Sequence, residues 1–323
     1  MSTVLVTGGA GFIGSSLCDF LLKSNHKIIN IDNFNDFYDP QIKRQNVQEN
    51  LNNPNYSLVE GDIRDLKLLK QVFDNNKVDV IIHLAAMAGV RPSIQSPLLY
   101  EDVNVRGTIN LLEICKTYRI NKFICASSSS VYGNNKKVPF SEDDIVDYSI
   151  SPYAATKKSC EVFGHVYHNL YNIDMIMLRF FTVYGPRQRP DLAIHKFADL
   201  ICKGEKIPFY GDGSSERDYT YIDDIIDGIV KSLDYINNNS NVYEIINLGE
   251  SHTISLSQMV ETIENELGIQ AELNPLPMQP GDVKRTFADI TKAKKLIGYN
   301  PQINFENGMK QFISWYKQKS LSL

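Results

Sequence analysis

The amino-acid sequence predicts an α/β protein with a doubly wound parallel sheet and a second, smaller domain of mixed α/β structure. Three observations support this prediction. Short apolar runs alternate with helical patterns in the first half of the chain, a glycine-rich turn follows the first apolar run, and Pro and Gly become frequent after residue 179. Alternation of strands with helices is typical of a parallel sheet that is covered by helices.

The first elements are a strand, a glycine turn and a helix. Residues 4–6 form a short apolar run, as in a strand that is buried on both faces. Glycines follow at three-residue spacing, and the apolar residues after them recur at helical spacing. The start of such a helix offers unpaired N–H groups and a partial positive charge, which suit a pyrophosphate. The order therefore predicts a Rossmann-type dinucleotide-binding turn. The residues expected to contact the cofactor are Gly8, Gly11, Phe12, Ile13 and Gly14.

The second strand is expected at 27–31, and Asp32 follows it directly. In dinucleotide-binding folds an acidic residue about 20 residues after the glycines binds the adenosine ribose. The carboxylate of Asp32 would accept hydrogen bonds from the ribose hydroxyls and would repel a 2′-phosphate, so NAD is favoured over NADP. A tight turn without a ligand is the alternative interpretation of the glycines, and Asp32 weighs against it.

The later elements of the first half continue the alternation. Further strands are expected at 56–59, 78–83, 122–126 and 175–180, and a long helix from about residue 96 to residue 118. The polar stretch at 33–55 is interpreted as an insertion near the adenosine, with a short helix around 40–49. Leu84, Ala85 and Ala86 follow the fourth strand, in a segment of mostly small residues. Parallel sheets bind ligands at the carboxyl ends of their strands, so this segment would let the cofactor approach.

The pattern changes after residue 179. Shorter helices and strands mix, which predicts a smaller domain at 180–323 that binds the substrate, after a cofactor domain at 1–179. The boundary between the two domains is not expected to separate the chain into two continuous segments. An amphipathic segment at 219–236 is expected to pack back on the first domain.

The composition is that of an ordinary globular protein. The chain has 323 residues, 43% hydrophobic and 22% charged, with a net charge of −5. No run of Lys or Arg indicates a nucleic-acid groove or a membrane anchor, so neither partner is expected. The five cysteines show no metal spacing, and buried thiols are the default interpretation. His83 is interpreted as a packed side chain, and no metal is expected. With no signal peptide or membrane-spanning run, a cytoplasmic location is expected.

The sharpest chemical signal is the pair Tyr153 and Lys157. Ser-Pro at 151–152 is a good helix start, which places the two side chains one turn apart on the same helix face. Free tyrosine has a pKa of about 10, so a shift of ~3 units, or ~4 kcal/mol, is needed for a base at neutral pH. The lysine ammonium and a positive nicotinamide would supply it. Ser128, after the fifth strand, could bond both the substrate oxygen and the tyrosine oxygen.

These features together resemble the extended short-chain dehydrogenase/reductases that act on nucleotide sugars. The segment 217–224 is similar to the arginine-led motif of that family, and 279–282 with 288–289 is similar to its carboxyl-terminal motif. The resemblance implies a bound NAD, a UDP-sugar substrate, and a homodimer paired through helices near 96–118 and 152–170.

The resemblance also assigns residues to the two ligands. Residues implied to contact them are Asn33, Asp62 and Ile63 at the adenosine, and Gln279 and Asp282 near the UDP ribose. Asn104 is implied to support the sheet and the active site. Arg217 is implied to grip the diphosphate, since a guanidinium binds phosphate through two contacts. A surface salt bridge of Arg217 with Glu216 or Asp218 is the alternative.

The serine run separates the reactions that such enzymes catalyse. The sugar 4,6-dehydratases of the resembled family carry Asp-Glu where Ser129 and Ser130 stand, and the UDP-glucuronate decarboxylases carry Glu at the second position. Serine cannot do that proton transfer at neutral pH. What remains is 4-epimerisation, which needs no extra acid, with both serines expected to contact the substrate.

The sugar-binding segment resembles that of the UDP-glucuronate 4-epimerases, as does the insertion at 32–40. Thr182 and Arg189 are implied to bind the sugar carboxylate, and Arg91 is a weaker candidate. An arginine fork suits a carboxylate, whereas a hydroxymethyl group would leave it unpaired. Solvated loop positions for Arg187 and Arg189 are the alternative. A UDP-glucose or UDP-N-acetylglucosamine 4-epimerase is the rival function, and a non-catalytic NAD-binding protein is a remote one.

Overall fold

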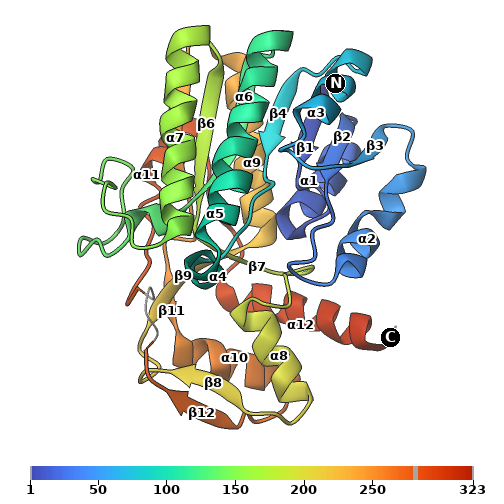
Figure 1. Cartoon of the computed structure of the whole chain (residues 1–323). Coiled ribbons are helices and arrows are strands. Elements are labelled where there is room, and N and C mark those ends of the chain that lie inside the picture. Colours follow the sequence, from blue (N-terminus) through green and yellow to red (C-terminus); the bar gives the residue numbers. More distant parts are fainter. Residues whose placement is uncertain (1, 279–282, 322–323) are drawn as a thin grey trace.

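The computed structural model describes residues 2–278 and 283–321 (Figure 1). Its centre is a seven-stranded sheet with the strand order β10-β6-β5-β4-β1-β2-β3, in which all neighbours are parallel. The strands are β1 (Thr3–Thr7), β2 (Lys27–Asp32), β3 (Tyr56–Glu60), β4 (Val80–His83), β5 (Lys122–Ser128), β6 (Asp174–Phe180) and β10 (Tyr243–Leu248). The predicted doubly wound sheet is therefore confirmed, and each of the six expected strands lies in it.

Alternate residues of the central strands enter two different cores. Val4 and Val6 belong to a cluster that includes side chains of α1 (Phe12–Lys23) and α9 (Ile222–Asn238). Leu5 points the other way, into a cluster formed with α3 (Leu66–Asn75) and α6 (Gly107–Tyr118). Successive side chains of a strand face opposite sides of a sheet, so a wholly apolar strand requires helices on both faces.

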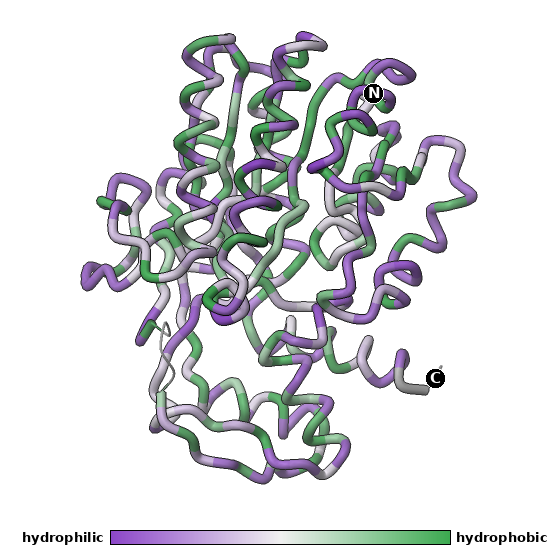
Figure 2. The backbone as a smooth tube through the Cα atoms, in the orientation of Figure 1, coloured by the Kyte–Doolittle hydropathy of each residue, from purple (hydrophilic) through white to green (hydrophobic). Residues whose placement is uncertain are grey.

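The first half of the chain also contains several further helices and helical turns. They are α2 (Pro40–Gln48), the 3₁₀ turn η1 (Glu49–Asn52), α4 (Val90–Gln95), α5 (Pro97–Tyr100), the π-helical segment η2 (Glu101–Arg106), the 3₁₀ turn η3 (Ser129–Tyr132) and α7 (Pro152–Tyr171). The helix expected at about 96–118 is thus present but contains a π-helical segment. Figure 2 shows that hydrophilic residues predominate in α2.

The second part of the chain forms two small sheets packed with helices at one end of the large sheet (Figure 1). The strands are β7 (Thr182–Tyr184), β8 (Ile207–Tyr210), β9 (Glu216–Tyr221), β11 (Thr253–Ser255) and β12 (Leu273–Leu276). The helices are α8 (Ala193–Cys202), α10 (Leu256–Leu267), α11 (Thr291–Ile297) and α12 (Phe305–Leu321). Strand β9 pairs with β7 in parallel and with β11 in antiparallel orientation, whereas β8 pairs with β12.

Two segments of the second part return to the large sheet. Helix α9 packs on β5 and β6, and β10 extends the sheet beyond β6. The sequence analysis did not assign β10 to this sheet. Its amino-terminal half is only partly buried, so its sequence lacks the uniform apolar run of the central strands.

Buried polar side chains test two further expectations. His83 is buried, with Nδ1 2.7 Å from Thr7 Oγ1 and Nε2 3.0 Å from Thr108 Oγ1, so its packed role is confirmed. Burial lowers the pKa of this imidazole to about 3.

The buried-thiol interpretation is wrong for Cys202, which is exposed at the end of α8, while the other four thiols are buried. Within residues 2–278 and 283–321, no cluster of His, Cys, Asp and Glu could hold a metal ion, and no helix has the length and apolarity of a membrane span.

Candidate functional site

The glycine turn brings strand, helix and the segment after β4 into close contact. Gly8 has φ +74°, and a Cβ there would lie 2.8 Å from the backbone nitrogen of Ala85. A Cβ on Gly14 would lie 2.1 Å from the carbonyl oxygen of Gly8. Gly11 is the N-cap of α1 and has no side chain to occupy the first amides of the helix. Those amides and the helix dipole make this turn suitable for a pyrophosphate.

Asp32 holds this turn against the end of β2. One carboxylate oxygen accepts a hydrogen bond from the backbone of Ala10 (3.0 Å) and the other from the backbone of Phe34 (2.9 Å). Burial raises the pKa of Asp32, and the two amides oppose that shift. Each oxygen keeps a second lone pair, so the predicted ribose contact fits this arrangement.

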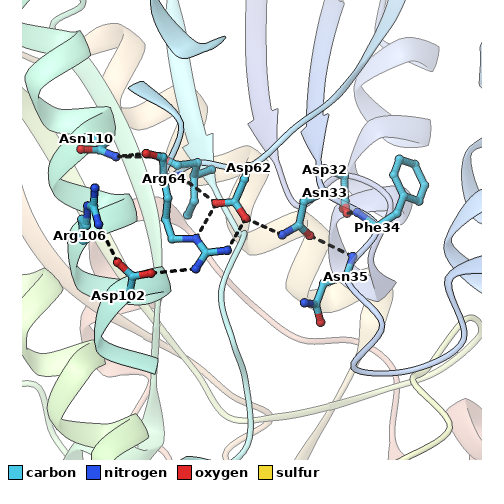
Figure 3. Close-up of polar contacts among 10 residues, drawn as sticks. Asp32, Asn33, Phe34, Asn35, Asp62, Arg64, Asp102, Arg106 and Asn110 are labelled. Atoms are coloured by element: carbon cyan, nitrogen blue, oxygen red, sulfur yellow. Dashed lines mark hydrogen bonds and ion pairs between the residues drawn. The ribbon is translucent and has the colours of Figure 1, made fainter. Parts of the chain in front are cut away.

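A network of hydrogen bonds and ion pairs begins at Asn33, the residue after Asp32 (Figure 3). Asn33 Nδ2 donates to Asp62 (2.9 Å), and Arg64 donates to both oxygens of Asp62 (2.9 and 2.8 Å) and to Asp102 (2.8 Å). Hydrogen bonds from Arg64 are the main reason that the pKa of Asp62 falls to about 2. The network fixes the start of the insertion on the π-helical segment η2.

Tyr153 and Lys157, the pair predicted to be catalytic, lie in the first turns of α7. Ser151 Oγ caps this helix by accepting from the backbone of Ala154 (3.1 Å), and Pro152 occupies its first turn, as the sequence predicts. Lys157 is buried, and its Nζ donates to the carbonyl of Ala126 at the end of β5 (2.8 Å). The Tyr153 ring meets that of Tyr100 edge to face, with 6.2 Å between centroids.

Asn104 of the π-helical segment η2 joins two other segments of the site. Its Oδ1 accepts from the backbone N–H of Met87 (2.8 Å), and its Nδ2 donates to the Met87 carbonyl (3.0 Å) and to Thr156 Oγ1 (3.0 Å). The small-residue segment after β4 is thereby tied to the residue that precedes Lys157. π-Helical turns occur frequently at functional sites.

A buried network that the sequence analysis missed lies beneath the serine run. Glu161 accepts from Ser127 Oγ (2.7 Å) and from Arg179 Nε and Nη2 (2.8 and 2.9 Å), and Arg179 Nη1 donates to Tyr132 (2.9 Å). Glu161 and Arg179 each have a side-chain exposure of 1%. Glu161 follows Lys157 by four residues, so the two side chains hold Ser127 and Ala126 from one helix face. This spacing was the only sequence signal for the network.

The serine run at 128–130 lines the larger of the two cavities that are described below. Ser128 Oγ accepts from the backbone N–H of Ser130 (3.2 Å) and from its hydroxyl (3.0 Å), which begins the 3₁₀ turn η3. The hydroxyl of Ser128 can still donate one hydrogen bond to a substrate or phenolate oxygen.

The arginines considered for the sugar end of the site differ in their surroundings. Arg189 has a side-chain exposure of only 17% and donates from Nε and Nη2 to Asp191 (2.9 and 2.7 Å), so the solvated-loop alternative is wrong for it. Arg187 has φ +66° and pairs with Asp19 of α1 (2.7 Å). Arg91 lies over the Tyr210 ring at 4.9 Å, and it does not line either of the two cavities described next.

Most of the predicted residues line two adjoining cavities. The larger has a volume of about 450 Å³; the predicted residues that line it are Gly8, Phe12, Ile13, Gly14, Leu84, Ala86, Ser128, Ser129, Ser130, Tyr153, Lys157, Thr182, Arg189 and Arg217. The smaller has a volume of about 140 Å³; those that line it are Gly8, Asp32, Asn33, Asp62, Ile63, Leu84, Ala85, Ala86 and Arg189. Gln279 and Asp282 lie outside the described residues. Arg189 therefore lies where the two cavities meet.

Arg217 enters the larger cavity from β9. Its Nη1 donates to the carbonyl of Glu216 (2.9 Å), and the Glu216 carboxylate pairs with Arg285 (2.7 Å). Asp218 is fully buried and accepts from backbone amides, including those of Glu250 (2.8 Å) and Ala288 (3.0 Å). The alternation of the strand thus sends Arg217 and Asp218 to opposite sides.

A glycine turn for a dinucleotide, joined to a Tyr-Lys-Ser cavity, defines an enzyme of the extended short-chain dehydrogenase/reductase type. The family model described as GDP-mannose 4,6 dehydratase matches residues 5–312, and the chain belongs to this family.

Named relatives lie within this family. A protein named UDP-glucuronate 4-epimerase from Thermodesulfobacterium geofontis is 43% identical over 319 residues, which cover 98% of this chain and 97% of the relative.

Two solved structures are similar over almost the whole fold. UDP-glucuronic acid 4-epimerase from Bacillus cereus, in complex with UDP-glucuronic acid and NAD, has a TM-score of 0.91 at 39% identity, covering 98% of this chain and 99% of the other. UDP-glucose 4-epimerase from Thermotoga maritima with UDP-glucose has a TM-score of 0.89 at 31% identity, with the same coverage.

Proposed function

We propose that this chain catalyses the NAD-dependent 4-epimerisation of UDP-glucuronate to UDP-galacturonate through a transient 4-keto sugar. One observation carries the proposal: Tyr153, Lys157 and Ser128 line the same cavity as Arg189, a largely enclosed arginine suited to a carboxylate. The similarity to enzymes that are named for this reaction supports it.

The residues present fit NAD. The uncapped first turn of α1 suits the pyrophosphate, and glycine at position 14 removes the Cβ that would collide with the turn. Asp32 suits the ribose hydroxyls and disfavours a 2′-phosphate. Lys157 would hold the nicotinamide ribose. When bound, NAD⁺ supplies the acceptor, and later the donor, of one hydride at sugar carbon 4.

The chain's own residues handle the proton and the oxygen. Tyr153, as a phenolate, takes the proton from the 4-hydroxyl, and Ser128 donates a hydrogen bond that orients the oxygen. Arg217 holds the diphosphate while the 4-keto sugar turns about its phosphate linkage and presents its other face. Tyr153 then returns the proton to the oxygen, which restores the 4-hydroxyl on the inverted carbon.

Loss of carbon dioxide is the side reaction that the site must prevent. A 4-keto uronic acid is a β-keto acid, and it decarboxylates when the breaking bond aligns with the carbonyl π system. Thr182 and Arg189 would hold the carboxylate out of that alignment. The positions where dehydratases carry an acid pair are Ser129 and Ser130, so the chain lacks the groups needed to remove water.

A product assay tests the proposal. The purified protein is incubated separately with UDP-glucuronate, UDP-glucose and UDP-N-acetylglucosamine, and the products are resolved by chromatography. We expect UDP-galacturonate as the main product and little UDP-pentose. Faster conversion of UDP-glucose would favour the rival function, because this chain is also similar to the UDP-glucose 4-epimerase of Thermotoga maritima.

We also propose a homodimer, a cytoplasmic location and the division into domains at 1–179 and 180–323. The dimer is supported by exposed apolar side chains along α7: Val162, Phe163, Val166 and Leu170. The free thiols are consistent with a reducing compartment. The division is supported by the separate small sheets, with α9 and β10 as segments that return to the first domain.

A further inference from the structure

The insertion between β2 and α2 carries an aromatic residue that the proposed function leaves without a role. Phe37 lines the smaller cavity, and its ring packs on the core beneath the sheet. The guanidinium carbon of Arg189 lies 5.2 Å from the centroid of this ring. A residue of the cofactor side thus contacts the arginine assigned to the sugar carboxylate.

The insertion is held in one conformation by its own polar groups. Asn35 N donates to Asn33 Oδ1 (3.0 Å), and Phe37 N donates to Asn35 Oδ1 (2.8 Å). Lys43 Nζ donates to the carbonyl of Asn35 (2.7 Å) and lies 4.7 Å from the centroid of the Tyr38 ring. Figure 3 shows how Asn33 also joins the insertion to Asp62. These hydrogen bonds restrain the backbone on both sides of Phe37.

The guanidinium of Arg189 is restrained on one face and along one edge. Phe37 covers a face, and Asp191 accepts from Nε and Nη2. Within the described residues, Nη1 has no hydrogen-bond partner, and Arg189 lines both cavities. A planar fork that is already ordered loses less conformational entropy when it binds a carboxylate.

We propose that Phe37 is a positioning residue for Arg189 and thereby determines specificity for the sugar carboxylate, an inference that rests on the proposed function. The aromatic face stabilises the cation and sets the plane of the fork. The insertion would then connect the adenosine side of the cofactor cavity with recognition of the sugar acid.

The test compares Phe37→Ala with Phe37→Tyr and Phe37→Leu, all at saturating NAD. Dissociation constants for UDP-glucuronate and for UDP are measured by calorimetry, and the products formed from UDP-glucuronate are resolved. We expect Phe37→Ala to lower the affinity for UDP-glucuronate about five- to tenfold relative to the affinity for UDP. The share of UDP-pentose among the products should rise. Phe37→Tyr should restore wild-type values because it keeps the ring, whereas Phe37→Leu keeps volume without a π face and should resemble Phe37→Ala.

Two outcomes separate this inference from the proposed function. If wild-type protein epimerises UDP-glucuronate but Phe37→Ala keeps the wild-type affinity ratio and product ratio, the positioning role is wrong and the function stands. If wild-type protein binds UDP-glucuronate no better than UDP and does not convert it, the proposed function fails. Equal weakening of UDP and UDP-glucuronate in Phe37→Ala would indicate a general structural effect and would also overturn the positioning role.

Discussion

Truncation of Arg189 is the substitution that most sharply tests recognition of the sugar acid. The side chain is 17% exposed and donates two hydrogen bonds to Asp191, so its guanidinium is held in one orientation. A hydrogen bond to a charged group contributes ~1.5–3 kcal/mol. Removal of one such contact to the sugar carboxylate therefore lowers kcat/KM for UDP-glucuronate by about 10- to 150-fold.

The effect on folding should be smaller than the effect on catalysis. Asp191 loses its partner in Arg189→Ala, but its side chain is 37% exposed and water can solvate it. Exposed ion pairs contribute at most ~1 kcal/mol to stability. The free energy of unfolding should therefore change little, which keeps the kinetic result interpretable.

The assay measures initial rates of UDP-galacturonate formation and, separately, the affinity for UDP. Arg187→Ala is the matched control, because Arg187 belongs to the same loop, pairs with Asp19 and lines neither cavity. We expect the rate of epimerisation by Arg189→Ala to fall by about 10- to 150-fold while its affinity for UDP stays near that of the wild type. Wild-type epimerisation by Arg189→Ala would refute the carboxylate assignment.

Three further substitutions address the base, the buried ion pair and the buried imidazole. Tyr153→Phe should retain NAD but show negligible turnover, and substantial turnover would reject Tyr153 as the base. Glu161→Gln should lower the free energy of unfolding by ~3–5 kcal/mol in chemical denaturation, because it leaves Arg179 buried without its anionic partner; an unchanged midpoint would contradict this. The pKa of His83 is lowered to about 3, so the unfolded chain binds the extra proton below about pH 6.5. Stability should consequently be full above that pH and fall by at most ~1.4 kcal/mol per pH unit as pH drops toward 3. His83→Gln should flatten this dependence, and an unaltered slope would show that other groups cause it.

The elements that the sequence predicted are those with a local cause. The apolar run at Val4–Val6, the glycine spacing and the Ser-Pro start of α7 each determine their element within a few residues. Tyr153 and Lys157 share a helix face for the same reason. Such features do not depend on which distant segment packs against them.

The parts that the sequence did not predict depend on contacts between distant segments. Strand β10 joins the large sheet only because β6 offers it an edge, and its partly buried half has no distinctive pattern. Glu161 and Arg179 look like ordinary surface charges in the sequence, yet they form a buried ion pair across α7 and β6. The contact of Phe37 with Arg189 joins residues 152 positions apart, which no local pattern could indicate.

The most direct test of the mechanism follows a deuterium placed at carbon 4 of UDP-glucuronate. The hydrogen that leaves this carbon should return to the same carbon, because the cofactor stays bound and the cavity holds the 4-keto sugar. We predict that mass spectrometry will find the deuterium retained in UDP-galacturonate, with no hydrogen gained from solvent at that carbon. Loss of the deuterium to solvent, or UDP-pentose as the main product, would contradict the mechanism.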